Sequence, residues 1–141
     1  MRAMTIESYK GRMISDRTPV FAYRNLHKDR WSLRAEAGPH KGKVIGHTDS
    51  LALIDCRLKV SEAGRQRVIA EQKKNVHAGV VGTIVRDFDP RPYDWEGNYA
   101  QRLSYNPYKA PTFTVDGEAV GYATMVHLSD DGKAYAYGCI R

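Results

Sequence analysis

The sequence predicts an α+β fold, in which a mostly antiparallel, twisted sheet of about six to eight strands carries one or two short helices. Apolar runs of strand length recur along the chain. Two Asp-Gly pairs, at 116–117 and 131–132, separate such runs and are typical of tight hairpin turns. With 141 residues, the chain is expected to form a single domain (1–141), in which residues 1–19 could be an N-terminal arm.

Five strands are expected in the first part of the chain, at 20–25, 31–36, 43–48, 51–60 and 76–85. The run at 76–85 is apolar on both faces, which favours a central strand. In 51–60, strict alternation predicts one apolar, core-facing set, namely Ala52, Ile54, Cys56, Leu58 and Val60. The opposite face would then carry Leu51, Leu53, Asp55, Arg57 and Lys59.

A weak helix is expected over 62–73, with Ser61 as its N-cap and Gly64 lowering its propensity. Two hairpins should follow, pairing 113–115 with 118–122 and 124–128 with 133–137. A two-residue turn in the second hairpin would place Leu128 opposite Tyr135 and Val126 opposite Tyr137, with both tyrosines in the core. Residues 87–101, in which Tyr93, Trp95 and Tyr99 lie, are predicted to form a long surface loop.

Composition restricts the classes of function. The 22 Lys and Arg residues against 16 Asp and Glu give a formal charge of +6, which suits an anionic partner. The two cysteines form no Cys-x-x-Cys motif, the histidines lack ligand spacing, and no phosphate-binding glycine motif occurs, so we expect no metal and no cofactor. Neither a signal-type apolar core nor a membrane-length apolar run is present, which predicts a cytoplasmic protein without membrane contact.

Three segments combine basic residues with Asn, His or Tyr beside a predicted strand: 23–28, 73–77 and 102–109. Such residues bind phosphates, stack on bases or transfer protons. The predicted nucleic-acid contacts are Tyr23, Arg24, Lys28, Arg30, Arg34, Lys73, Lys74, Arg102 and Lys109. The candidate catalytic residues, for metal-free cleavage of RNA, are His27, His77 and Tyr105.

Each catalytic candidate also has a structural interpretation. His77 could be a core histidine with satisfied hydrogen bonds, and His27 could be exposed without a function. Tyr105 precedes Asn106-Pro107 and could anchor a turn.

Residues 23–28 followed by Trp31-Ser32, Gly64-Arg65 with Arg67-Val68, and the segments 74–78 and 105–109 resemble a family of small proteins from phages and other mobile elements of proteobacteria. This resemblance covers the whole chain and implies an origin rather than an activity. The Tyr-Asn-Pro stretch with the following hairpin is faintly similar to metal-independent toxin ribonucleases of the barnase, colicin and RelE type, over about a quarter of the chain. The long β segments before the helix depart from those folds.

Three functions stay open on this basis. The first is a phage or mobile-element accessory protein that contacts RNA or DNA through a basic face. The second is a small metal-independent ribonuclease or nucleotide-processing enzyme. The third is an inhibitor that binds a host defence protein.

Overall fold

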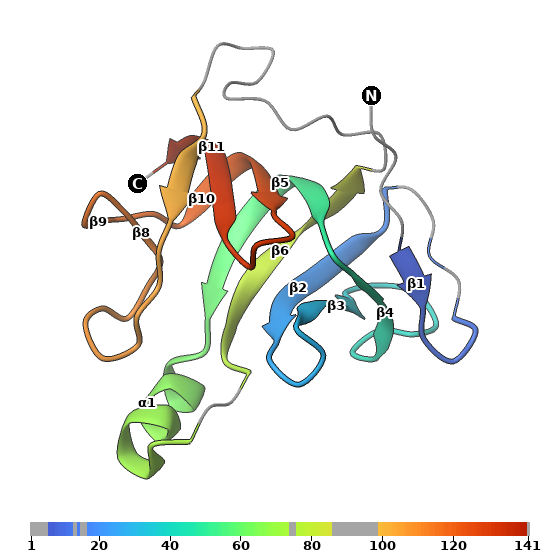
Figure 1. Ribbon diagram of the computed structural model, residues 1–141, viewed down its shortest axis with the longest axis horizontal. Coiled ribbons are helices and arrows are strands. Elements are labelled where there is room, and N and C mark those ends of the chain that lie inside the picture. The colour runs from blue at the N-terminus through green and yellow to red at the C-terminus, as the bar shows by residue number, and fades with distance from the viewer. Residues whose placement is uncertain (1–5, 13, 15–16, 74–75, 86–98, 141) are drawn as a thin grey trace.

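The computed structural model describes residues 6–12, 14, 17–73, 76–85 and 99–140. Its main feature is a nine-stranded sheet in the order β1-β4-β3-β2-β6-β5-β10-β11-β7, with every neighbouring pair antiparallel (Figure 1). The sheet strands are β1 (Ile6–Ser8), β2 (Pro19–Asn25), β3 (Arg30–Ala35), β4 (Val44–Thr48), β5 (Leu51–Val60), β6 (Ala78–Val85), β7 (Gln101–Leu103), β10 (Tyr122–Leu128) and β11 (Ala134–Ile140). The mostly antiparallel sheet is therefore confirmed, with a small helical share.

The predicted central strand is confirmed. β6 is fifth in the order of nine strands and lies between β2 and β5. Val80 and Ile84 on β6 belong to the main apolar cluster, together with Val20 of β2 and Leu58 of β5. We call the side of the sheet that carries this cluster the core face.

β5 contains a bulge that corrects the predicted faces of this strand. Ile54 pairs with Thr83 of β6, but the next pair is Arg57 with Val81, so β5 has one residue more than β6 over this stretch. Asp55 within it has a left-handed φ of 53°. The extra residue reverses the alternation. Leu51 and Leu53 therefore share the core cluster with Cys56 and Leu58, whereas Ala52 and Ile54 pack in a separate cluster.

The second hairpin is shifted by one residue from the prediction, because its turn has three residues. Ser129 N–H bonds to Lys133 O, and Gly132 has a φ of 84°, as expected for a three-residue loop that ends in a left-handed glycine. Leu128 consequently pairs with Ala134, and Tyr135 pairs with His127. Neither tyrosine therefore belongs to the main core cluster: Tyr135 is half-buried, and Tyr137, opposite Met125, is buried in the separate cluster with Ala52 and Met125.

The remaining elements follow the prediction in outline. The Asp116-Gly117 turn joins β8 (Thr114–Val115) to β9 (Glu118–Ala119), a shorter hairpin than expected. Ser61 caps the helix α1 (Glu62–Glu71), and its Oγ accepts a bond from Gly64 N–H. The possible N-terminal arm contributes β1 at the sheet edge. Most of the predicted loop 87–101 lies outside the described residues.

The sheet curls around its core. Trp31 Nε1 of β3 donates a hydrogen bond of 2.7 Å to Ser129 O, in the turn after β10. β3 and β10 are separated by three strands in the sheet order, so this contact requires curvature. Among the described residues, no helix is long and apolar enough to cross a membrane.

Candidate nucleic-acid interface

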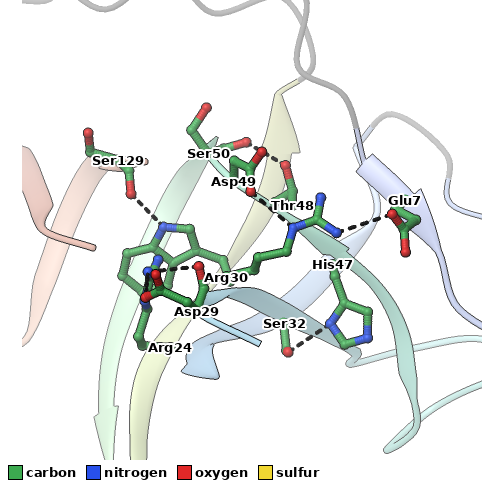
Figure 2. A network of polar contacts seen from close by, with 11 residues as sticks. Glu7, Arg24, Asp29, Arg30, Ser32, His47, Thr48, Asp49, Ser50 and Ser129 are labelled. Atoms are coloured by element: carbon green, nitrogen blue, oxygen red, sulfur yellow. Dashed lines mark hydrogen bonds and ion pairs between the residues drawn. The ribbon is translucent and has the colours of Figure 1, made fainter. Parts of the chain in front are cut away.

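Arg24 is held inside the β2–β3 hairpin by Asp29 and Trp31, and Trp31 joins this hairpin to the turn after β10. Arg24 Nη2 donates to the backbone oxygen of Asp29 at 2.9 Å and to its Oδ1 at 2.6 Å (Figure 2). The guanidinium carbon lies 5.2 Å from the centroid of the Trp31 ring, which is only 6% exposed. Arg24 Nη1 is buried and has no acceptor among the described residues. The guanidinium of Arg24, which was predicted to contact nucleic acid, is therefore already bound by groups of the protein.

Arg30, another predicted contact, is paired with two carboxylates. Its Nη1 lies 3.2 Å from Glu7 Oε2 of β1, and its Nε lies 3.0 Å from Asp49 Oδ1 after β4 (Figure 2). These ion pairs connect the hairpin to the edge of the sheet. Ion pairs of this partly exposed kind contribute about 0–1 kcal/mol each.

A buried polar chain that the sequence did not predict lies beside Arg30. Asn25 Nδ2 donates to Ser32 Oγ at 3.1 Å, and Ser32 Oγ lies 2.9 Å from His47 Nδ1. His47 is 4% exposed, and its Nε2 has no hydrogen-bond partner among the described residues. Burial, with help from Lys28 and Arg30, lowers the pKa of His47, while Glu7 acts in the opposite direction.

The side of the sheet opposite the core face carries basic and aromatic residues in register. Phe21 of β2 pairs with Arg34 of β3 and with Val81 of β6. Val81 pairs in turn with Arg57 of β5, which pairs with Tyr122 of β10. Directly paired residues point to the same side of a sheet. We define the basic sheet face as this row with its neighbours on β2 and β5: Phe21, Tyr23, Arg34, Arg57, Lys59, Val81 and Tyr122.

The cations of the basic sheet face differ from those of the hairpin in their partners. Among the described residues, no carboxylate forms an ion pair with Arg34, Arg57 or Lys59. Arg57 and Lys59 are exposed, and Arg34 is half-buried. Within the described part of the chain, none of these three cations is therefore held in an ion pair, and Asp55, the acid near Arg57 in the sequence, bonds to Tyr122 instead.

His77 and Tyr105, two of the three catalytic candidates, are in contact. His77 Nε2 lies 2.7 Å from Tyr105 Oη, and the Tyr105 ring packs on Phe113 with centroids 5.0 Å apart. Arg65 of α1 binds the same loop, since its Nη1 donates to Pro107 O at 2.7 Å. Burial raises the pKa of the Tyr105 phenol, and Arg65 partly opposes that effect.

His27, the third catalytic candidate, has a different hydrogen-bond partner. It is exposed in the turn after β2, where its backbone N–H donates to Asn25 Oδ1. β2 ends and β6 begins at the same end of the sheet, near α1 (Figure 1). His27 is therefore at the same end of the sheet as His77.

The other predicted contacts are spread over the surface. Tyr23 is buried on the basic sheet face. Four are exposed, namely Lys28, Lys73, Arg102 and Lys109. Lys74 lies outside the described residues.

Cys56 is not in an environment that would suggest thiol chemistry. It is fully buried, and burial raises the pKa of its thiol to about 12. Cys139 is half-buried, and among the described residues neither cysteine forms a disulfide. Within the described part of the chain, no group of three or more His, Cys, Asp or Glu residues could hold a metal ion.

Sequence reasoning missed Arg57 and Lys59 as candidate contacts. The alternation of the 51–60 run had already placed both on one face, so the signal was present in the sequence. The sequence does not show that Arg57 and Lys59 align with Phe21 and Arg34, because that alignment depends on the pairing of distant strands.

The family model described as Mycobacterium phage L5 gene 82 protein matches residues 13–136 of this chain. The chain belongs to this family. The Gene 82 protein of Mycobacterium phage L5 is 35% identical over 121 residues, which cover 80% of this chain and 91% of that protein. No solved structure matches. Membership of a phage protein family is thus confirmed, whereas neither comparison supports a proteobacterial origin or a likeness to toxin ribonucleases.

Proposed function

We propose that this chain is a phage accessory protein that binds nucleic acid through the basic sheet face. The observation that carries the proposal is the row in which Arg34, Phe21, Val81, Arg57 and Tyr122 follow one another across five neighbouring strands. A surface that combines cations with aromatic rings suits a ligand with phosphates and bases. The formal charge of +6 is consistent with such a ligand.

The proposal selects this face over the other basic residues because its cations form no ion pairs with described residues. A phosphate that approaches Arg24, Arg30 or Arg65 must compete with a carboxylate that is already bound. At Arg34, Arg57 and Lys59 it meets no such competitor among the described residues. Arg34 and Arg57 are three strands apart, or roughly 14 Å at about 4.8 Å per strand, so one extended backbone can contact both.

Binding to labelled single-stranded and duplex DNA and RNA, measured with EDTA present over a series of salt concentrations, tests the proposal. Three phosphate contacts on a single strand predict that log K falls against log salt with a slope of about −2. The double variant Arg57→Ala/Lys59→Ala should bind more weakly and with a shallower slope. If the native protein binds none of these ligands at low salt, the proposal is wrong, and a host protein becomes the favoured partner.

A matched control separates a specific face from general positive charge. Lys41 and Lys133 are exposed in the turns after β3 and β10. The variant Lys41→Ala/Lys133→Ala therefore removes the same charge from other surfaces. It should keep the native slope. Equal losses in the two double variants would show that net charge alone drives binding.

A second function, metal-free cleavage of RNA, is favoured by the hydrogen bond between His77 and Tyr105. In that reaction a base takes the 2′-hydroxyl proton, the 2′ oxygen attacks phosphorus, and an acid protonates the 5′ oxygen as its bond to phosphorus breaks. His77 would be the base and Tyr105 the acid, with His27 at the same end of the sheet as a further proton donor. Lys109 or Arg102 would contact the phosphate.

Incubation of labelled RNA with the protein in EDTA tests this second function. Cleavage that is lost in His77→Gln and in Tyr105→Phe, with binding retained, would support it. Intact RNA after prolonged incubation with the native protein would leave the pair as a structural anchor between β6 and the loop before Phe113.

A further inference from the structure

Two aromatic rings lie among the cations of the basic sheet face. Phe21 and Tyr23 are two residues apart on β2, so their side chains leave the same side of the strand. Their centroids are 5.9 Å apart, and their planes are tilted by 31°. Val81 packs with both rings. Together these three side chains form an apolar island within a basic surface.

The Phe21 ring rests on the backbone of β6. A Cβ atom added at Gly79 would come within 2.7 Å of Phe21 Cζ, so the absence of a side chain at Gly79 makes room for the ring. A ring held against the sheet in this way is fixed before any ligand arrives. The island is therefore preorganised for a flat partner.

The Arg34 guanidinium lies over both rings. Its central carbon is 5.6 Å from the Phe21 centroid and 5.4 Å from the Tyr23 centroid. The two rings are only 8% and 9% exposed. Arg34 has no carboxylate partner among the described residues, so its contacts with the rings are what position it. Guanidinium contacts of this kind are weak near water, and a nucleic-acid base can replace them by stacking.

We propose that the ligand of the basic sheet face is single-stranded nucleic acid, with a base stacked on Tyr23 and Phe21 where the Arg34 guanidinium now lies. This inference rests on the proposed function, because it names the ligand class of the same surface. Arg34, once displaced, contacts the adjacent phosphate, and Arg57 and Lys59 contact phosphates further along the strand. A duplex keeps its bases stacked on one another, so it gains nothing from the rings.

Fluorescence anisotropy with labelled oligothymidine of about 20 nucleotides, and with a duplex of equal length, tests the inference. Tyr23→Leu and Phe21→Leu keep apolar volume on the sheet and remove the aromatic face. We expect each to raise the Kd for oligothymidine by about 5-fold to 100-fold and to leave the Kd for the duplex unchanged. Tyr108→Leu, which removes an exposed ring from another surface, should change neither Kd.

A second readout does not depend on the variants folding. Oligothymidine that carries 5-iodouracil should crosslink to Tyr23 on irradiation, and peptide mass spectrometry locates the adduct. Circular dichroism melts of each variant provide the fold control.

The outcomes distinguish the inference from the proposed function. If oligothymidine binds with the native salt dependence, but the two leucine variants bind it normally and the crosslink maps elsewhere, base stacking on these rings is wrong while the basic face stands. Equal losses for single strand and duplex would also overturn the stacking. If the native protein binds neither these DNAs nor single-stranded or duplex RNA at low salt, the proposed function itself fails.

Discussion

Arg24 and Arg30, the ion-paired cations of the β2–β3 hairpin, have the same chemistry as the cations of the basic sheet face but different partners. Arg24 and Arg30 are bound to Asp29, Glu7 and Asp49. Arg34, on the same hairpin, contacts only aromatic rings in its described interactions, and Arg57 on β5 is exposed and forms no ion pair with a described residue. From the sequence alone, these four arginines are indistinguishable, because each is a basic residue in or near a predicted strand. Their partners separate the cations that hold the fold from those that are available to a ligand.

The largest effect on stability is expected from a substitution of Trp31, which packs beside the paired cation Arg24 in the hairpin. Trp31→Ala removes a buried ring, its hydrogen bond to Ser129 O and the stacking surface of Arg24. We expect it to lower the free energy of unfolding by about 3–5 kcal/mol in urea denaturation. A loss below about 1 kcal/mol would contradict the role of this hairpin in closing the curled sheet.

Arg24 and Arg57 provide a smaller contrast between the two regions. Arg24→Ala removes a charged hydrogen-bond set and a cation–π contact, and we expect a loss of about 1–2 kcal/mol in the free energy of unfolding. Arg57→Ala, at an exposed strand position, should stay within about 0.5 kcal/mol of the native protein. Thermal melts followed by circular dichroism compare them. Equal losses of unfolding free energy in the two variants would mean that ion-pair partners do not distinguish the structural arginine from the exposed one.

The smallest expected effect is a pH dependence of stability that arises from His47, whose pKa is influenced by Arg30. Because the pKa of His47 is lowered in the folded state, the neutral ring is favoured there. The stability that it contributes is present above the unfolded pKa of about 6.5 and is lost as pH falls through the folded pKa. The Tm of the native protein should therefore fall more between pH 8 and pH 5 than that of His47→Gln. Parallel curves for the two proteins would contradict this.

The sequence predicted much of the fold because its signals are local. Asp116-Gly117 specifies its own turn, Ser61 caps its own helix, and the doubly apolar run around Val80 requires a central strand. The prediction was wrong where one residue changes the register. Asp55 in a bulge reversed the faces of β5 before the bulge, and Gly132 in a three-residue turn reversed those of β11. Alternation alone contains neither event.

The candidate site was less predictable because it depends on long-range pairing. From residue types, the sequence named His27, His77 and Tyr105 as catalytic candidates, and the structure brings His77 and Tyr105 into contact. It assigned Arg24 and Arg34 to the same role, although their side chains end on opposite sides of one hairpin. Only the order of β3, β2, β6 and β5 reveals which cations share a surface.

The most direct test of the central claim compares two double variants that remove equal charge, from a formal +6 to +4. Arg57→Ala/Lys59→Ala removes unpaired cations, and Arg24→Gln/Arg30→Gln removes paired ones. The measurement is the slope of log K against log salt for single-stranded DNA, on folded protein. We predict that the first variant makes the slope shallower by about 1.4, whereas the second keeps the native slope and only lowers stability. A shallower slope in the second variant, with the native slope retained in the first, would contradict the account.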